Sequence, residues 1–283
     1  MSDNALNPAG DGMTELAVSV PDVSKVFAAR TGGGVTALES VSLDFAAGEF
    51  VSLIGPSGCG KSTLMRLIAD LDSPSSGAIT VFGKSARQAR LDQDYGIAFQ
   101  QAGLLPWRTV RENIELPLQL HGVGTAARRA RASELIDLVG LGDFGDRHPD
   151  QLSGGMQQRV AIARSLAESP RLLLMDEPFG ALDEMTRERM QTELARLRAE
   201  TGAAVVFVTH SIPEAVYLSD RVVVMSPRPG RIVQILDMKL GGADARTEAL
   251  REDSHFFERV SAVREALHGD PATAARARGV ENR

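Results

Sequence analysis

The sequence predicts an α/β fold in which a mostly parallel sheet carries a phosphate-binding loop. Short apolar runs, rich in β-branched residues, recur at 50–54, 171–175, 204–209 and 221–225. Longer stretches with helical periodicity separate them, and this alternation is typical of a parallel sheet covered by helices. The first run leads directly into GPSGCGKST at 55–63, which matches the P-loop pattern G-x-x-x-x-G-K-S. An expected helix, KSTLMRLIADL, follows, so strand, loop and helix come in the order that a P-loop requires.

The P-loop (55–63) is expected to hold the phosphates of a nucleoside triphosphate. Its glycines let successive backbone N–H groups point at phosphate oxygens, and the following helix adds its positive N-terminal end. Lys61 supplies a cation for the β- and γ-phosphates, and the Ser62 hydroxyl suits Mg²⁺ coordination. A glycine-rich turn without a ligand would not explain a match at every specified position. The predicted nucleotide-binding residues of the loop are Gly55, Pro56, Ser57, Gly58, Cys59, Gly60, Lys61, Ser62 and Thr63.

Two acidic residues follow the apolar run at 171–175. A carboxylate at the end of a buried strand is costly without a function, so Asp176 is predicted to hold Mg²⁺, directly or through water. Glu177 is predicted to be the general base that polarises the attacking water. A helix N-cap is the structural alternative for such a pair, but the neighbouring Pro178 and the upstream P-loop argue against it.

Two further polar residues follow short apolar runs. His210 follows VVFVT, whose strand is expected beside the one that carries the two acids, and it is predicted to sense the γ-phosphate. A satisfied core histidine is the alternative. Gln100 follows GIAF and is predicted to bridge the Mg²⁺ or the water to a helical insertion; Gln101 is the alternative, and the spacing after Phe99 favours Gln100. The predicted metal ligands are therefore Ser62, Asp176 and Gln100.

The most discriminating segment is LSGGMQQR at 152–159, here called the signature. Ser153, Gly154 and Gly155 precede an expected helix, so they would form a second anion site at a helix N-terminus. One chain would then hold two phosphate-binding elements for a single nucleotide. The economical explanation is a head-to-tail homodimer, in which each signature closes on the nucleotide held by the other subunit's P-loop.

Six segments together resemble the ATP-binding cassette (ABC) transporter ATPases, in that family's order: GPSGCGKST, FQ at 99–100, LSGGMQQR, LLLMDEP, ALD at 181–183 and VTH at 208–210. The resemblance runs from about residue 15 to 235. It implies a P-loop NTPase with a RecA-like core, an antiparallel β subdomain near the N-terminus and a helical subdomain that bears the signature. It also implies ATP and Mg²⁺ as cofactors, stacking of adenine on Phe27, and communication across the dimer through Asp183. Simple core packing is the alternative for Phe27.

Three segments look like one branch of that family, the branch serving nitrate, taurine, aliphatic sulfonate and pyrimidine-precursor uptake: LLPWRTVREN at 104–113, PFGALDEMTRERMQ at 178–191 and EAVYLSDRVVVMSPRPGRI at 214–232. The resemblance implies an ATPase subunit that drives a separate membrane permease. An extracytoplasmic solute-binding protein would deliver the solute to that permease. The resemblance does not name the solute. An exporter subunit and a soluble non-transport ABC ATPase are the alternatives. The interval between Lys61 and Ser153 is too short for the long coiled coil that the soluble class would need.

Composition limits the partners and the compartment. The 283 residues carry a formal net charge of -6, which does not favour a nucleic-acid partner. One cysteine, Cys59, permits no internal disulfide and indicates a reducing compartment. No run reaches the ~18 apolar residues needed to span a bilayer, and the N-terminus lacks the pattern of a secretory signal. We therefore expect a cytoplasmic protein, peripheral on the inner face of the cell membrane.

Three regions are expected along the chain. They are a disordered tail at 1–14, an ATP-binding domain at 15–236 with its helical subdomain at about 102–155, and a C-terminal extension at 237–283 with a helix at about 255–267 and a frayed end. The sequence leaves the role of the extension open. It also does not decide whether Trp107, the single tryptophan, lies in the core or on a docking surface for the permease.

Overall fold

The computed structural model describes residues 15–28, 33–242 and 245–269. The predicted tail at 1–14 lies outside these residues, as does the expected frayed end from residue 270 onward. Within the described ranges, none of the helices has both the length and the apolar character to cross a membrane.

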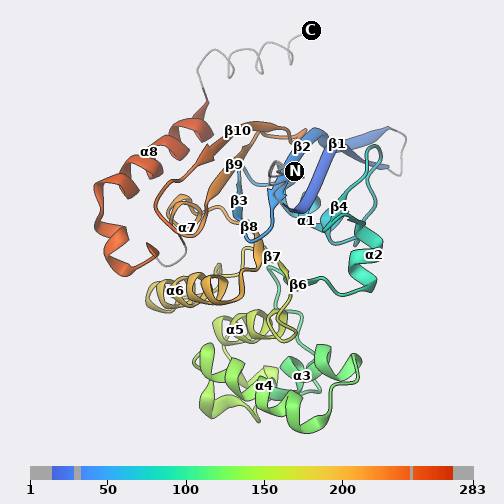
Figure 1. The fold of residues 1–283 in the computed structure, drawn as a ribbon, viewed down its shortest axis with the longest axis vertical. Helices are drawn as coiled ribbons and strands as arrows, with labels where there is room; N and C mark the ends of the chain where they lie inside the picture. Colours follow the sequence, from blue (N-terminus) through green and yellow to red (C-terminus); the bar gives the residue numbers. More distant parts are fainter. Residues whose placement is uncertain (1–14, 29–32, 243–244, 270–283) are drawn as a thin grey trace, which may run out of the picture.

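A six-stranded sheet of order β10-β9-β3-β8-β7-β6 forms the centre of the molecule (Figure 1). Five strands run parallel, and only β10 pairs antiparallel, with β9. The strands are β3 (Phe50–Ile54), β6 (Tyr95–Ala98), β7 (Leu172–Asp176), β8 (Ala204–Val208), β9 (Arg221–Met225) and β10 (Ile232–Asp237). The mostly parallel sheet predicted from the apolar runs is confirmed.

The unbroken apolar character of the central strands follows from burial on both faces of the sheet. In β7, Leu173 and Met175 pack into one hydrophobic core, whereas Leu172 and Leu174 pack into a second core on the opposite face. All five residues of β3, β7 and β8 are buried for the same reason. The sheet is therefore anchored between two cores, which fixes the positions of its strand ends.

A second, antiparallel sheet of order β2-β1-β4-β5 lies near the N-terminus, as the resemblance implied. It consists of β1 (Leu16–Ala28), β2 (Gly34–Ala46), β4 (Thr80–Val81) and β5 (Lys84–Ser85). Its buried residues share one core with α1 (Lys61–Ile68) and with one face of the central sheet. The short helix α2 (Ala86–Leu91) begins at the Ser85 cap, whose hydroxyl accepts from the Gln88 N–H.

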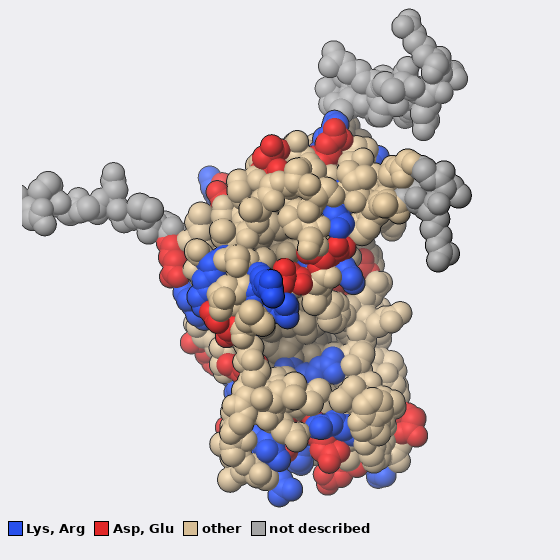
Figure 2. Space-filling view, turned by 90° about the vertical axis from the view of Figure 1, so that its right-hand side faces the viewer, with Lys and Arg blue, Asp and Glu red and all other residues tan. Residues whose placement is uncertain are grey.

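Three helices gather at the opposite end of the molecule (Figure 1): α3 (Val110–Leu120), α4 (Thr125–Leu138) and α5 (Gly154–Ser165). Thr109 and Glu112 form a capping box that starts α3, and the Ser153 hydroxyl caps α5 by accepting from the Met156 N–H. Turned by 90°, the molecule is hollowed between this helical end and the larger upper part (Figure 2).

The C-terminal part of the chain packs against the central sheet. It contains α6 (Glu184–Thr201), α7 (Ile212–Leu218) and α8 (Ser254–His268), and α8 contacts α7, β9 and β10. The predicted helix at about 255–267 thus corresponds to α8. Phe256, Val260 and Val263 of α8 are buried in the same core as α7. The described part of the extension is therefore integrated into the subunit's own core.

Two adjacent phenylalanines of α8 provide a test of this packing. Phe256 is 5% exposed, whereas Phe257 is 56% exposed. We expect Phe256→Ala to lower the free energy of unfolding by about 3 kcal/mol, because it leaves a cavity in the core. Phe257→Ala is the matched control and should cost much less. Urea denaturation of both variants measures the difference; equal losses would contradict the packing of α8 described above.

Candidate functional site

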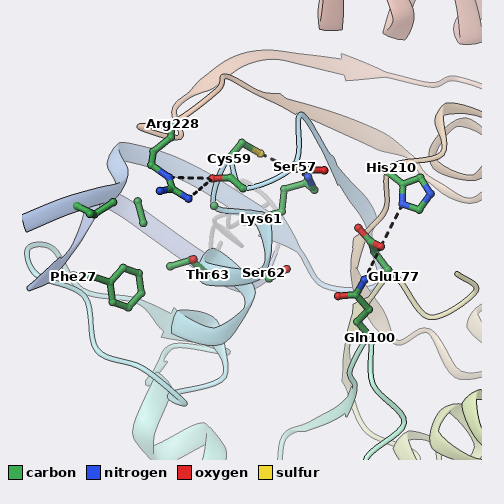
Figure 3. A pocket seen from close by; sticks show the side chains of 14 residues that line it. Phe27, Ser57, Cys59, Lys61, Ser62, Thr63, Gln100, Glu177, His210 and Arg228 are labelled. Atoms are coloured by element: carbon green, nitrogen blue, oxygen red, sulfur yellow. Dashed lines mark hydrogen bonds and ion pairs between the residues drawn. The ribbon is translucent and has the colours of Figure 1, made fainter. Parts of the chain in front are cut away.

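One cleft of about 760 Å³ collects most of the predicted site residues (Figure 3). The P-loop lies between two groups of side chains. Phe27 and Arg228 lie at one end, and Gln100, Glu177 and His210 lie at the other. The lining residues are Phe27, Val35, Ala37, Ser57, Gly58, Cys59, Gly60, Lys61, Ser62, Thr63, Gln100, Glu177, His210 and Arg228. Gly55 and Pro56 of the predicted set lie at the start of the loop, outside this lining.

The P-loop delivers an uncapped helix N-terminus to the cleft. Gly60 precedes α1 with φ of 104°, a left-handed conformation that side chains disfavour, and no side chain caps the helix. The first-turn N–H groups are therefore available to an anion. The Lys61 ammonium donates to the carbonyl oxygens of Gly55 at 2.8 Å and Pro56 at 3.0 Å. A phosphate could take over these contacts with little movement of the side chain.

Asp176 ends β7 beside Ser62, whose hydroxyl hydrogen-bonds to the Asp176 carboxylate. Burial raises the pKa of Asp176 above its ordinary value, the Ser62 hydrogen bond opposes the rise, and the charge of Glu177 adds to it. Lys61 provides a further opposing charge. A desolvated carboxylate next to a hydroxyl at the phosphate loop fits a divalent cation, because both are hard oxygen ligands of the kind Mg²⁺ prefers. Asp176 and Ser62 are the residues that would hold it.

Glu177, Gln100 and His210 meet at the other end of the P-loop. The Gln100 amide donates to Glu177 Oε2 at 3.1 Å, and His210 Nδ1 lies 3.3 Å from the same oxygen. The parallel pairing of β7 with β8 brings Glu177 and His210 together, as their positions after adjacent strands predicted. Glu177 has φ of 46°, and such a backbone costs about 1–3 kcal/mol for a residue other than glycine. Its carboxylate is thereby directed into the cleft. Gln101 does not line the cleft.

Phe27 lies at the far end of β1, 41% exposed, and its ring borders the cleft. The interpretation of Phe27 as a core residue is therefore wrong. The Lys25 ammonium lies over the ring, 4.8 Å from its centroid, and the part of the ring that remains exposed borders the cleft. An exposed aromatic face at this position is suitable for stacking a base.

Arg228 is a cleft residue that the sequence analysis missed. Its Nε and Nη2 donate to the Gly58 carbonyl oxygen at 3.3 and 3.4 Å. Arg228 belongs to the segment at 214–232, which indicates only a branch of the family. Its place in the cleft follows from the parallel pairing of β9 with β3, in which Ile54 lies opposite Val224. The chain that leaves β9 must then emerge at the same sheet edge as the P-loop.

The signature lies outside this cleft. Ser153, Gly154 and Gly155 do not line it, and neither does Asp183. Asp183 instead caps α6 by accepting from the Thr186 N–H at 3.0 Å, and that hydrogen bond lowers the pKa of the Asp183 carboxyl. Gly155 packs closely against the loop 179–183, because a Cβ at this position would lie 3.1 Å from the Ala181 carbonyl oxygen. The two predicted phosphate-binding elements of one chain are therefore separate.

Two single residues, Cys59 and Trp107, have distinct environments. Cys59 is 1% exposed, and its Sγ lies 3.7 Å from the Lys61 ammonium.

Trp107 is 70% exposed, so the alternative that it is a core tryptophan is wrong. Trp107 borders a polar groove of about 430 Å³ together with charged side chains that include Arg111 and Glu115.

The buried Asp176 carboxylate gives a pH-dependent prediction for the ligand-free chain. The pKa of the Asp176 carboxyl in the folded chain is raised above the ordinary 3.8, so its ionisation destabilises the fold. This penalty is absent below pH 3.8 and grows as the pH rises through the raised pKa. Asp176→Asn should therefore raise Tm most at neutral pH and least near pH 4. Thermal unfolding in EDTA, without nucleotide, measures the shift. Asp146→Asn is the control, because its carboxylate is 94% exposed. A lower Tm for Asp176→Asn at neutral pH would contradict the prediction.

Comparisons with known proteins identify the family. The model of the family described as "ABC transporter" matches residues 38–180. The chain is 46% identical to the taurine import ATP-binding protein of Rhizobium johnstonii, over 89% of this chain and 96% of that one. It is 43% identical to the nitrate import ATP-binding protein of Synechocystis, over 89% and 95%.

A solved structure agrees with the sequence relatives. The ATP-binding cassette MJ0796, described as a dimer in a post-hydrolysis state bound to ADP and Pi, has a TM-score of 0.73 and 36% identity. The match covers 78% of this chain and 99% of that one. The family and the branch predicted from the motifs are thus confirmed. The chain belongs to the ABC transporter family, as an ATPase that uses ATP and Mg²⁺.

Proposed function

We propose that this chain is the ATP-hydrolysing subunit of an importer for a small solute of the nitrate, sulfonate, taurine or pyrimidine-precursor type. The observation that carries the proposal is the assembly in one cleft of the P-loop, Gln100, Glu177 and His210. The relatives support the direction of transport, because two of them are named import ATP-binding proteins, for taurine and for nitrate. A third, from Synechocystis, is named a bicarbonate transport ATP-binding protein and is 46% identical, over 85% of this chain but only 36% of that one.

The predicted site residues in and beside the cleft have specific roles in the proposed hydrolysis. The P-loop N–H groups and Lys61 bind the phosphates, and Phe27 stacks on adenine. Ser62 and Asp176 would hold Mg²⁺, whose charge would offset that of the phosphates. Glu177 accepts the proton of the attacking water. Gln100 orients Glu177 or joins the Mg²⁺ shell, and His210 contacts the γ-phosphate.

The separate location of the signature supports a head-to-tail homodimer. Ser153, Gly154 and Gly155 stand at the N-terminus of α5, away from the cleft of their own chain, so a second copy would have to supply them. Closure would be specific for the triphosphate, and hydrolysis would remove the contact that holds the copies together. This cycle works only if open and closed dimers bind ATP with different affinities. Asp183, in the loop beside Gly155, would face the partner.

The membrane permease is the second proposed partner, and it would hold the chain on the inner face of the cell membrane. Trp107 is the candidate anchor on the chain's side. An exposed tryptophan is a common hot spot of protein interfaces. The groove beside it is lined with arginine and glutamate side chains, which suits a partner segment with both apolar and charged groups. An extracytoplasmic solute-binding protein would act only through the permease.

Glu177→Gln tests the proposed chemistry. The amide cannot accept the water proton, so kcat should fall by about 100-fold or more, whereas ATP binding should persist because the P-loop is unchanged. ATP-dependent dimerisation should also persist and become long-lived, since the nucleotide is not consumed. Steady-state phosphate release and size-exclusion chromatography with ATP measure both properties. Wild-type turnover by Glu177→Gln would exclude it as the base.

Trp107→Ala tests the proposed docking surface. Because the indole is mostly exposed, its loss should change the free energy of unfolding by about 0.5 kcal/mol or less. Binding to the permease should weaken, while the basal ATPase activity of the isolated chain stays at the wild-type level. Leu120→Ala, also exposed but not part of the lining of that groove, is the control. Unchanged permease binding would remove Trp107 from the interface.

An affinity pull-down of the tagged chain from gently solubilised membranes tests the transport assignment itself. Recovery of a polytopic permease together with a soluble binding protein would support the importer. Titration of that binding protein with nitrate, sulfonates and pyrimidine precursors would then identify the solute. Recovery of soluble partners alone would leave the ATPase chemistry standing and would refute the importer.

A further inference from the structure

The backbone on both sides of His210 is tied to one buried acid, Glu214, in the first turn of α7. Glu214 is 8% exposed, and its Oε2 accepts from Thr209 Oγ1 at 2.6 Å. The same Thr209 oxygen accepts from the Ser211 N–H at 3.0 Å, and Ser211 Oγ accepts from the Glu214 N–H at 3.4 Å. The His210 side chain itself is 68% exposed. Its position therefore depends on the backbone that Thr209 and Ser211 hold.

Arg187 of α6 joins this acid to the loop 179–183. Its Nε lies 3.5 Å from Glu214 Oε1, and its Nη2 donates to the Leu182 carbonyl oxygen at 2.8 Å. The same loop packs against Gly155 of the signature. A continuous set of contacts thus runs from the signature, through the loop and Arg187, to Glu214 and the residues flanking His210.

The ion pair borders a cavity that reaches the reacting end of the P-loop cleft. The cavity measures about 450 Å³ and is lined by Glu177, His210, Arg187 and Glu214, among others. Burial raises the pKa of the Glu214 carboxyl, and the Thr209 hydrogen bond and the Arg187 charge oppose the rise. A buried carboxylate is costly unless it is paired, so removal of Arg187 should disturb Glu214 and the backbone that it holds. The open space beside the pair leaves room for such a displacement.

We propose that Arg187 and Glu214 are positioning residues that couple the loop 179–183 to His210. The inference rests on the proposed function, because in a head-to-tail dimer the signature and this loop would face the other copy. A shift of the loop on closure would move the Arg187 guanidinium, and Glu214 would pass the shift to His210. Hydrolysis at each P-loop would thereby depend on the contacts made by the same chain's signature at the other nucleotide.

Three variants test the coupling in the full-length chain: Arg187→Met, Glu214→Gln and Thr209→Val. Each should lower kcat for MgATP by about 10-fold to 100-fold, because small misplacements of a catalytic group have effects of this size. KM for ATP should stay within about twofold, since the P-loop contacts are untouched. Arg187→Met combined with Glu214→Gln should be no slower than the slower single variant, because each substitution breaks the same link. Arg187→Lys keeps the charge and should restore part of kcat.

The matched control is a second ion pair on α6, between Arg196 and Glu193, at 2.9 Å. Its arginine side chain is 58% exposed, so Arg196→Met and Glu193→Gln should leave kcat unchanged. If Arg187→Met, which lies at a partly exposed position, folds and keeps wild-type kcat, the coupling is refuted. Rate losses that multiply in the double variant would refute it as well. The head-to-tail dimer of the proposed function fails separately, if Glu177→Gln stays a monomer with ATP in size-exclusion chromatography.

Discussion

The site depends on one constraint, the parallel arrangement of neighbouring strands in the central sheet. These strands are, in order, β9, β3, β8 and β7. Parallel strands place all their carboxyl ends at one edge of the sheet, so residues that follow different strands meet there. The P-loop follows β3, Asp176 ends β7 with Glu177 directly after it, and His210 follows β8. The register, with Asp176 opposite Val208, sets the distance between Glu177 and His210. Burial of the strands in two cores then keeps this edge rigid.

The functional residues at this edge of the sheet lower the stability of the fold locally. Asp176 is a desolvated carboxylate, and Glu177 has a left-handed backbone. Neither of these features is what stability alone would select, and a P-loop site needs both of them when MgATP arrives. Strain and unfavourable charge of this kind concentrate at functional sites, where the surrounding fold compensates for them.

The sequence predicted what depends on local pattern. The apolar runs gave the central strands, and the motif spacing gave the P-loop, the two acids, Gln100 and His210. It missed Arg228, whose role in the cleft depends on the pairing of β9 with β3. It also missed the link between Arg187 and Glu214, which belong to different helices and carry no motif. Contacts between distant segments cannot be obtained from periodicity, and exposure of a single residue such as Trp107 cannot be obtained from composition.

The separation of the signature from the cleft of its own chain has a consequence for control. The cleft of one subunit holds the groups for binding and for activation of water, whereas its signature is held apart on α5. If a second copy must supply the signature, ATP alone cannot complete the site. Hydrolysis then requires the dimer to close. The contacts from Gly155 through the loop 179–183 give each subunit a physical means to respond to that closure. In the proposed importer, a separate permease needs only to favour or oppose closure to control hydrolysis.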